Sequence, residues 1–133
     1  MAQVLRTEST ISSNIAAKGL RTAFNILDKW GCRPEQACRI LGMKKSTYYK
    51  NRESTGNARL TNDQIERISY ILNMHAALRA VFDNPENVYG FMSMSNQNPY
   101  FNGSAPLDLI STGQFGALYE TFRRVDTLRG GGL

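Results

Sequence analysis

The chain has 133 residues, of which 41% are hydrophobic and 20% charged, a composition that argues against disordered and collagen-like proteins. This length predicts one domain, or two small subdomains that share a core. No run of residues approaches the roughly 18 consecutive apolar positions of a membrane span, and the N-terminus lacks the apolar segment of a secretory signal. The two cysteines, Cys32 and Cys38, suit a reduced cytoplasmic protein better than a disulfide scaffold.

The net charge of +5 is distributed unevenly along the chain. Residues 1–60 carry eleven basic and four acidic residues, a net charge of +7, whereas residues 61–133 carry five basic and seven acidic residues, a net charge of −2. An excess of positive charge confined to one half of a chain favours a nucleic-acid-binding subdomain there. A solvated basic surface without a partner is the alternative.

The first predicted helix follows a polar segment. Residues 1–13 are rich in Ser and Thr and show no helical periodicity, so we expect a flexible arm. Apolar residues then recur mostly every three or four positions until Gly31, which predicts an amphipathic helix that ends there. These apolar positions are Ile15, Leu20, Ala23, Phe24, Leu27 and Trp30.

Residues 33–52 resemble a helix-turn-helix. Pro34 suits the first turn of a short helix, and Gly42 ends that helix. Two short helices that cross closely need small side chains on the inner face of the first, and Ala37 and Cys38 supply them. The tight turn between them needs a residue that accepts positive φ, as Gly42 does. A plain helical hairpin with a charged solvent face is the alternative, and the basic half of the chain disfavours it.

The second helix of this motif is predicted over residues 45–53, anchored by Ile40, Leu41 and Tyr48. Its outward face has side chains that suit phosphate contacts, and those near its N-terminus would reach base edges in the major groove. The candidate DNA-binding residues are therefore Lys44, Lys45, Ser46, Thr47, Tyr49, Lys50 and Arg52.

A long helix is predicted over residues 61–83, with a break near Asn73 or Met74 as an alternative. Thr61 is its expected N-cap, and Gln64 occupies the capping-box position. The expected buried stripe of this helix consists of Ile65, Ile68, Ile71, Leu72, His75, Leu78, Val81 and Phe82.

Shorter helices complete the chain. Asn84-Pro85 is expected to start a helix through about Phe91, before a polar loop over residues 93–103. Ser104 is the expected cap of a helix over residues 105–111 that Gly113 stops. The last helix has regularly spaced apolar residues, and no strand-like alternation occurs, so the predicted fold class is all-α. Those last apolar residues are Phe115, Leu118, Phe122 and Val125.

The segment Asn102-Gly-Ser-Ala-Pro-Leu-Asp-Leu-Ile110, followed by a terminal helix and a glycine-rich end, resembles the toxin-binding domain of the MbcA/ParS/Xre antitoxins. With the upstream helix-turn-helix, the resemblance covers roughly residues 15–133. Together with the composition and periodicity of the chain, the resemblance predicts a flexible arm over residues 1–13, a helix-turn-helix DNA-binding subdomain over residues 14–60 and a helical dimerisation and toxin-binding domain over residues 61–133. It also implies two partners. One is a cognate RES-domain toxin that degrades NAD and whose active site the antitoxin blocks; the other is operator DNA, which the complex binds to repress its own operon.

The resemblance places the toxin-facing surface on the terminal helix and tail, at Arg123, Arg124, Asp126, Thr127, Arg129, Gly130, Gly131, Gly132 and Leu133. The arginines lie mostly off the apolar stripe of the last helix, so we expect them to be free for a partner. The glycine run lacks side chains and suits insertion into a narrow cleft. A frayed, solvated terminus is the alternative. Some relatives end with an aromatic residue after the glycines where this chain ends in Leu133, which leaves the depth of tail insertion open.

Neither catalysis nor a bound cofactor or metal is expected of this chain. Its single histidine, His75, falls on an apolar stripe and is expected in the core or an interface, and one histidine with two cysteines makes no four-ligand zinc site. The rival hypothesis is a stand-alone helix-turn-helix transcriptional regulator without a toxin partner. For the antitoxin we expect a homodimer within a hetero-oligomeric complex, because helix-turn-helix proteins usually bind two half-sites. The dimer contact is expected at the Leu20/Phe24/Leu27 stripe or on the helix over residues 61–83.

Overall fold

The computed structural model describes the backbone of residues 2–54 and 56–130, and the side chains in these ranges from residue 14 onward. Over these residues the chain forms helices and no strand, which confirms the all-α prediction. The helices are α1 (Ala2–Lys29), α2 (Pro34–Leu41), α3 (Lys45–Glu53), α4 (Asn62–Val81), α5 (Pro85–Gly90), α6 (Pro106–Ile110) and α7 (Phe115–Thr127), with 3₁₀ turns η1 (Phe91–Ser93) and η2 (Leu128–Gly130).

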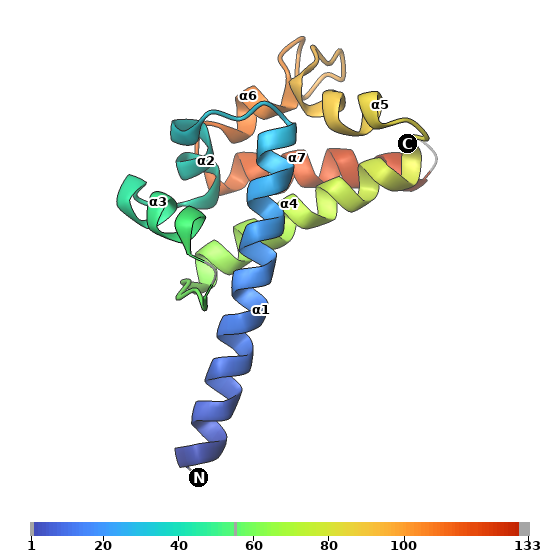
Figure 1. Ribbon diagram of the computed structural model, residues 1–133. Helices are drawn as coiled ribbons and strands as arrows, with labels where there is room; N and C mark the ends of the chain where they lie inside the picture. Colours follow the sequence, from blue (N-terminus) through green and yellow to red (C-terminus); the bar gives the residue numbers. More distant parts are fainter. Residues whose placement is uncertain (1, 55, 131–133) are drawn as a thin grey trace.

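Helix α4 is the central element of the fold. It packs against α1 on one side and against α7 on another, and Figure 1 shows α1 crossing in front of it. Buried apolar side chains from α1, α2, α4, α6 and α7 belong to one continuous hydrophobic cluster. The two halves of the chain therefore share a core, as the length predicted. The largest fully buried side chains are Trp30, Leu20, Leu27, Ile40, Leu41, Ile71, Met74, Leu78, Met92, Ile110, Leu118 and Val125.

Helix α1 is longer than the sequence predicted. It begins at Ala2, so the expectation of a non-helical arm over residues 1–13 is wrong for residues 2–13. Forming the first turn of a helix is costly, but each residue added afterwards gains one hydrogen bond. A polar stretch can therefore extend a helix that has already formed. The C-terminal end is where it was expected, because Gly31 adopts a left-handed φ of 80°.

The capping box at the start of α4 is confirmed. The Gln64 N–H donates to the Thr61 hydroxyl at 3.1 Å, and the Thr61 N–H donates to Gln64 Oε1 at 3.0 Å. The helix runs to Val81 without the alternative break near residue 73. The predicted buried stripe is only partly correct, because Ile65 and Val81 are 46% and 37% exposed. These two residues lie near the two ends of α4.

The cap of α6 also differs from the prediction. Ala105, not Ser104, is the N-cap, with φ −74° and ψ 142°. Pro106 explains the difference, because the residue before a proline is pushed to extended geometry and proline itself suits the first helical position. The preceding loop turns through Asn102 (φ 50°) and Gly103 (φ 89°), and Gly113 (φ 81°) ends the turn before α7.

Candidate DNA-binding and toxin-binding surfaces

The turn between α2 and α3 has the geometry expected of a helix-turn-helix. Gly42 adopts φ 65° and ψ 41°, and the Met43 N–H donates to the Cys38 carbonyl at 2.9 Å. Ala37 is buried and Cys38 half-buried, so the small residues lie on the inner face as predicted. The Tyr48 ring, 4% exposed, packs edge-on against Phe24 with centroids 5.4 Å apart. Helix α3 is therefore fixed on α1 by its predicted anchor.

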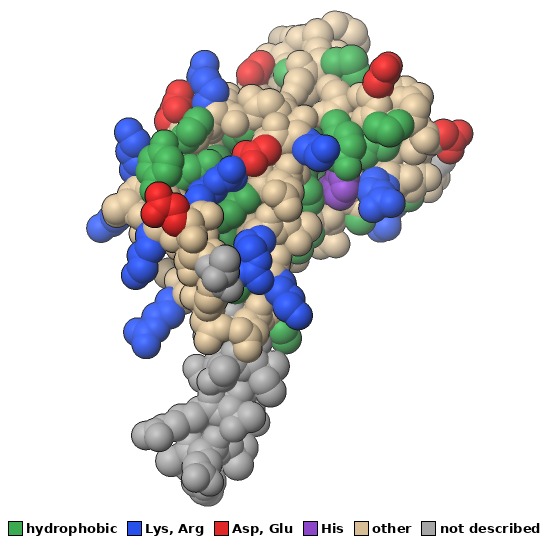
Figure 2. Space-filling model, in the orientation of Figure 1, with side chains coloured by type: hydrophobic (Ala, Val, Ile, Leu, Met, Phe, Trp, Pro, Cys, Tyr) green, Lys and Arg blue, Asp and Glu red, His purple; other side chains and the backbone are tan. Residues whose placement is uncertain are grey.

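The outward face of α3 is basic and polar. The candidate DNA-binding residues are exposed except Thr47, which is half-buried. Lys44 is the N-cap of α3 and makes no side-chain cap, so its side chain leaves the first backbone N–H groups of the helix uncapped at a basic end. Figure 2 shows basic side chains gathered on the left of the view, where Figure 1 places α3. Such a face offers cations and backbone donors to an anionic partner.

Arg52 differs from the other candidates because it already has a partner. Its guanidinium donates two hydrogen bonds to the Asp28 carboxylate, at 3.2 and 2.9 Å, and lies over the rings of Phe24 and Tyr48. The hydrogen bonds with Asp28 raise the pKa of Arg52 further above its usual value. This residue ties α3 to α1. Among the described residues, no carboxylate lies within ion-pair distance of Lys44, Lys45 or Lys50.

The candidate toxin-binding residues of α7 and η2 form an exposed polar surface. Leu118, Thr121 and Val125 turn inward, whereas Arg123, Arg124, Thr127, Arg129 and Gly130 are exposed and Asp126 is half-buried. Gly131, Gly132 and Leu133 lie outside the described residues.

The three arginines lie off the apolar stripe and are exposed, but each already has an ion-pair partner within the chain. Arg123 and Arg124 both pair with Glu120, at 3.3 and 3.2 Å, and Arg129 pairs with Asp126 at 2.8 Å. Spacings of three and four along a helix bring such pairs together. These pairs are exposed and therefore weak, at roughly 0–1 kcal/mol each. A partner with its own carboxylates could replace them at small cost.

Two tyrosines next to this surface, Tyr70 and Tyr119, were not among the predicted site residues. Tyr70 of α4 contacts Phe115, Tyr119 and Phe122 of α7, with ring centroids 5.1–5.8 Å apart. Tyr119 is 42% exposed. In the sequence, only the position of Tyr119 beside the apolar stripe of the last helix pointed to it. Its contact with Tyr70 joins residues far apart in the chain, which local spacing does not predict.

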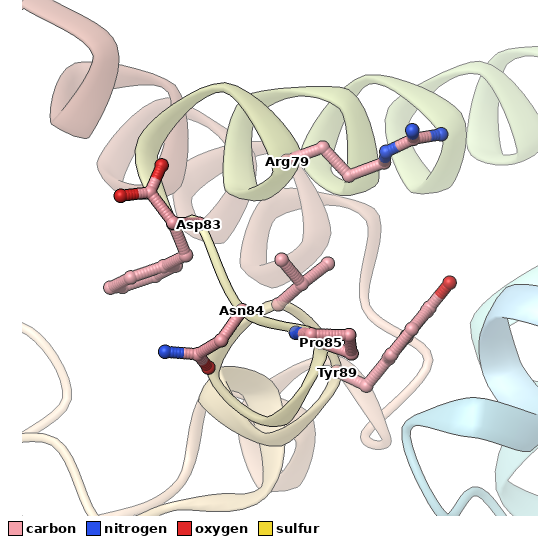
Figure 3. Close-up of a pocket in the computed structure, with 7 residues that line it drawn as sticks. Arg79, Asp83, Asn84, Pro85 and Tyr89 are labelled. Carbon is pink, nitrogen blue, oxygen red and sulfur yellow. The ribbon is translucent and has the colours of Figure 1, made fainter.

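A polar hollow of about 360 Å³ lies where α4 ends and α5 begins (Figure 3). Arg79 and Tyr89 lie on one side of it, and Asp83 and Asn84 on the other. Asn84 Oδ1 accepts a hydrogen bond from the Asn87 N–H at 2.8 Å, so this side chain caps α5. Among the described residues no group of three potential metal ligands occurs.

His75 lies in a neighbouring hollow between α1, α4 and α5. Its ring stacks on Tyr89 at 5.5 Å, and its Nδ1 atom is buried without a hydrogen-bond partner. Burial, with a smaller contribution from the Arg79 guanidinium, lowers the pKa of His75. Burial raises the pKa of Cys32 to about 12, so this thiol does not provide a reactive thiolate at neutral pH. Neither side chain has the environment of a catalytic group.

Arg67 of α4 links the helix-turn-helix to the C-terminal unit. The guanidinium is almost fully buried, and its Nε donates to Asp63 Oδ2 at 2.9 Å. Its Nη1 donates to the carbonyls of Arg39 and Ile40 in α2, at 3.4 and 3.3 Å, and of Gly113 before α7, at 2.9 Å. One side chain therefore satisfies backbone acceptors of both units.

A second set of hydrogen bonds joins the same units. Arg39 Nε donates to the Ser111 carbonyl at 2.7 Å, and Gln36 Nε2 donates to the Ser111 hydroxyl at 3.3 Å. Gln64 Nε2 donates to the Gly42 carbonyl at 3.1 Å. The end of α2 is therefore fixed to both α4 and the turn before α7.

These features define a helix-turn-helix protein with a second helical unit fixed to it. Two protein families match the chain. The antitoxin Xre-like helix-turn-helix domain matches residues 9–73, and the antitoxin Xre/MbcA/ParS C-terminal toxin-binding domain matches residues 77–131. The chain is 30% identical over 124 residues to the uncharacterized protein y4oB of Sinorhizobium fredii (strain NBRC 101917 / NGR234), an alignment that covers 92% of each chain. No solved structure matches significantly.

The chain therefore belongs to the Xre/MbcA/ParS antitoxin family, as the resemblance predicted. It is an antitoxin with a helix-turn-helix DNA-binding domain and a toxin-binding domain, not an enzyme. The two family matches meet inside α4, the helix that packs against both units. None of the described helices is both long and apolar enough to cross a membrane.

Proposed function

We propose that this chain is the cytoplasmic antitoxin of a RES-domain toxin that degrades NAD, that it blocks the active site of this toxin, and that the complex binds operator DNA to repress its own operon. One observation carries the proposal: the two family matches fall on two exposed surfaces of different chemistry at opposite ends of one continuous hydrophobic core. Figure 1 shows α3 on the left of the molecule and the C-terminal end on the right. Both partners can therefore bind the same chain at once.

The α3 face supports the DNA-binding part of the proposal. Lys44, Lys45 and Lys50 are exposed, and no described carboxylate pairs with any of them. Cations on an exposed recognition helix neutralise backbone phosphates and release counterions. Ser46 and Thr47 lie in the first turn, where short polar side chains come closest to base edges. We assign phosphate contacts to the lysines and base contacts to this first turn.

The end of α7 supports the toxin-binding part. Arg123, Arg124 and Arg129 project from the end of α7 and from η2, within the match to the toxin-binding domain, and their ion pairs are exposed. When the toxin binds, each guanidinium can exchange its carboxylate within the chain for a carboxylate of the toxin. Because the exposed ion pairs are weak, this exchange costs little free energy, and the planar guanidinium makes the new contact specific. We assign toxin contacts to these arginines and to the segment that follows them.

Two variants test the proposal by separating its parts. Cells that co-express the chain with the RES-domain protein of the adjacent reading frame should keep their NAD, and deletion of residues 129–133 should abolish this protection. The same deletion should leave the circular dichroism spectrum and operator binding unchanged.

The matched control is Lys44→Ala/Lys45→Ala/Lys50→Ala, which should lose operator binding at physiological salt and still protect the cells. If the truncated chain protects as well as the full chain, the tail is not the toxin-blocking element. If no adjacent toxin exists and the truncation affects DNA binding alone, the chain is a stand-alone regulator.

A further inference from the structure

The hollow that contains His75 brings nitrogen-bearing side chains of two helices together. Its volume is about 230 Å³, and it is lined by Thr22, Asn25 and Lys29 of α1, by His75 and Arg79 of α4 and by Tyr89 of α5, among others. Figure 2 shows the histidine, in purple, with basic side chains on both sides of it. Among the described residues, no carboxylate lies within ion-pair distance of Lys29 or Arg79. Positive charge therefore collects at this hollow without a paired carboxylate.

The Tyr89 ring holds two of these side chains in place. The His75 ring stacks on it, with the centroids 5.5 Å apart, and Lys29 Nζ lies 5.0 Å from its centroid. A cation over an aromatic face is attracted by the electrons of the ring. Because the Nδ1 atom of His75 is buried, the Nε2 edge of the imidazole is the one that lines the hollow.

The arrangement of these donors suits an anion with more than two acceptor oxygens. Lys29 lies in the last turn of α1, whereas His75 and Arg79 lie four positions apart on α4. A single guanidinium already binds both oxygens of a planar carboxylate. A phosphate monoester has three terminal oxygens and roughly two negative charges at neutral pH, so it can accept from the ammonium, the imidazole and the guanidinium at once. The donors therefore favour a phosphate over a carboxylate.

We infer that this hollow is a binding site for a phosphate monoester, with Lys29, His75 and Arg79 as the residues that hold the phosphate. The polar hollow at the end of α4 adjoins it, because Arg79 and Tyr89 line both. Figure 3 shows Asp83 and Asn84 across that second hollow from Arg79 and Tyr89. A carboxylate and an amide accept hydrogen bonds from hydroxyl groups, so the alcohol part of the ester fits there.

The site lies where the two family matches meet. Lys29 belongs to the match with the helix-turn-helix domain, and Arg79 and Tyr89 belong to the match with the toxin-binding domain. None of the candidate DNA-binding or toxin-binding residues lines the hollow. A bound ester joins α1 to α4 and α5 and stabilises the folded chain by mass action. The inference is independent of the proposed function, because neither toxin nor operator takes part in it.

Nuclear magnetic resonance of the untagged full chain tests the inference, because His75 is the only histidine and its ring signals are unambiguous. Inorganic phosphate and glycerol 3-phosphate, titrated at constant pH and ionic strength, should shift these signals until the site is saturated. Sodium acetate should shift them only at much higher concentration. Bound phosphate should also raise the pKa of His75, since a nearby anion favours the imidazolium.

Lys29→Gln/Arg79→Gln removes both cations and keeps polar side chains at the two positions. It should weaken the binding of glycerol 3-phosphate at least about ten-fold, because two charged hydrogen bonds are lost. The matched control, Lys18→Gln/Arg21→Gln, removes the same charge from exposed positions of α1 outside the hollow and should bind as the wild type does. Glycerol 3-phosphate should raise the midpoint of thermal unfolding of the wild type and of the control, but not of the Lys29/Arg79 variant.

The inference is overturned if the His75 signals respond to the phosphates no more than to acetate, or if the Lys29/Arg79 variant binds glycerol 3-phosphate as tightly as the wild type. A response to a short DNA duplex, with none to the phosphates, would also overturn it, because these residues would then contact the DNA backbone. Circular dichroism spectra that match the wild type confirm that both variants are folded.

Discussion

Single residues of α3 have different roles although they share one face. Arg52 and Lys50 are both exposed cations near the end of the helix, and both were predicted to bind DNA. The structure gives Arg52 two hydrogen bonds to Asp28 and two aromatic rings beneath its guanidinium. Arg52 attaches α3 to α1, and Lys50 makes no such contact. We therefore expect substitution of Arg52 to affect mainly the stability of the fold and substitution of Lys50 to affect mainly DNA binding.

Arg52→Ala should lower the free energy of unfolding by about 1 kcal/mol, a value that already allows for solvent screening of a partly exposed pair. Lys50→Ala should leave the free energy of unfolding unchanged and reduce the salt dependence of operator binding by about one phosphate contact, a slope change near 0.9. Urea denaturation and fluorescence anisotropy at several salt concentrations measure the two effects. Equal effects of both substitutions on stability would show that the Asp28 pair contributes nothing.

His75 should make the free energy of unfolding depend on pH. Its pKa in the folded state lies below the ordinary value of 6.5, mainly because of burial, so the unfolded chain binds protons more readily. The stability is therefore fully present above about pH 6.5 and decreases as the pH falls below it. His75→Gln should show a smaller loss of unfolding free energy between pH 7.5 and 5.5 than the wild type. Urea titrations at the two pH values test this, and an unchanged loss in the variant would assign the effect to other groups.

At the scale of elements, the C-terminal end of α2 is held by hydrogen bonds from side chains of α4. The last carbonyls of α2 accept hydrogen bonds from Arg67, and the Gly42 carbonyl accepts one from Gln64, so side chains of α4 cap a helix of the DNA-binding unit. A Cβ atom on Gly42 would lie 3.1 Å from Asp63 Oδ2 and 3.2 Å from Arg67 Nε, which shows how closely these elements approach. The hydrogen bond from Arg67 to the Gly113 carbonyl extends this connection to α7.

Arg67→Met should lower the free energy of unfolding by about 3 kcal/mol, because buried carbonyls of both units lose their donor. Arg79→Met, on the exposed side of the same helix, is the control and should change the stability by less than about 0.5 kcal/mol. Thermal unfolding followed by circular dichroism compares the two variants. A loss of similar size in both would mean that the buried guanidinium has no special role.

At the scale of the whole molecule, the positive charge and the toxin-binding unit lie at different ends of one core. The half with net charge +7 contains α3, whereas the half with net charge −2 contains α7 and the tail. This separation is the reason why deletion of residues 129–133 should affect the toxin and spare the operator. The hydrophobic cluster contains residues from Ala17 to Val125, so both surfaces are attached to the same core.

The sequence predicted several features of the fold accurately because each depends on neighbouring residues. Proline at the start of α2, glycine at its end and the reciprocal hydrogen bonds of Thr61 and Gln64 act within a few positions, so their bounds agree with the structure. Ser104 was the wrong cap because Pro106 determines the backbone of the residue before it. The prediction of a non-helical arm was wrong for residues 2–13, because a polar segment can continue a helix that has already formed in the residues next to it along the chain.

By itself, then, the sequence determined the all-helical class, the helix-turn-helix and the basic half of the chain, since periodicity, caps and charge are properties of local order. Only the tertiary structure decided which polar groups are already paired and which apolar residues remain uncovered. Arg52 forms hydrogen bonds with Asp28, Arg67 donates to carbonyls of both units, and Ile15 of α1 and Ile65 of α4 line the same groove. Each of these outcomes joins residues at least 24 positions apart, and no local spacing specifies a contact of that length.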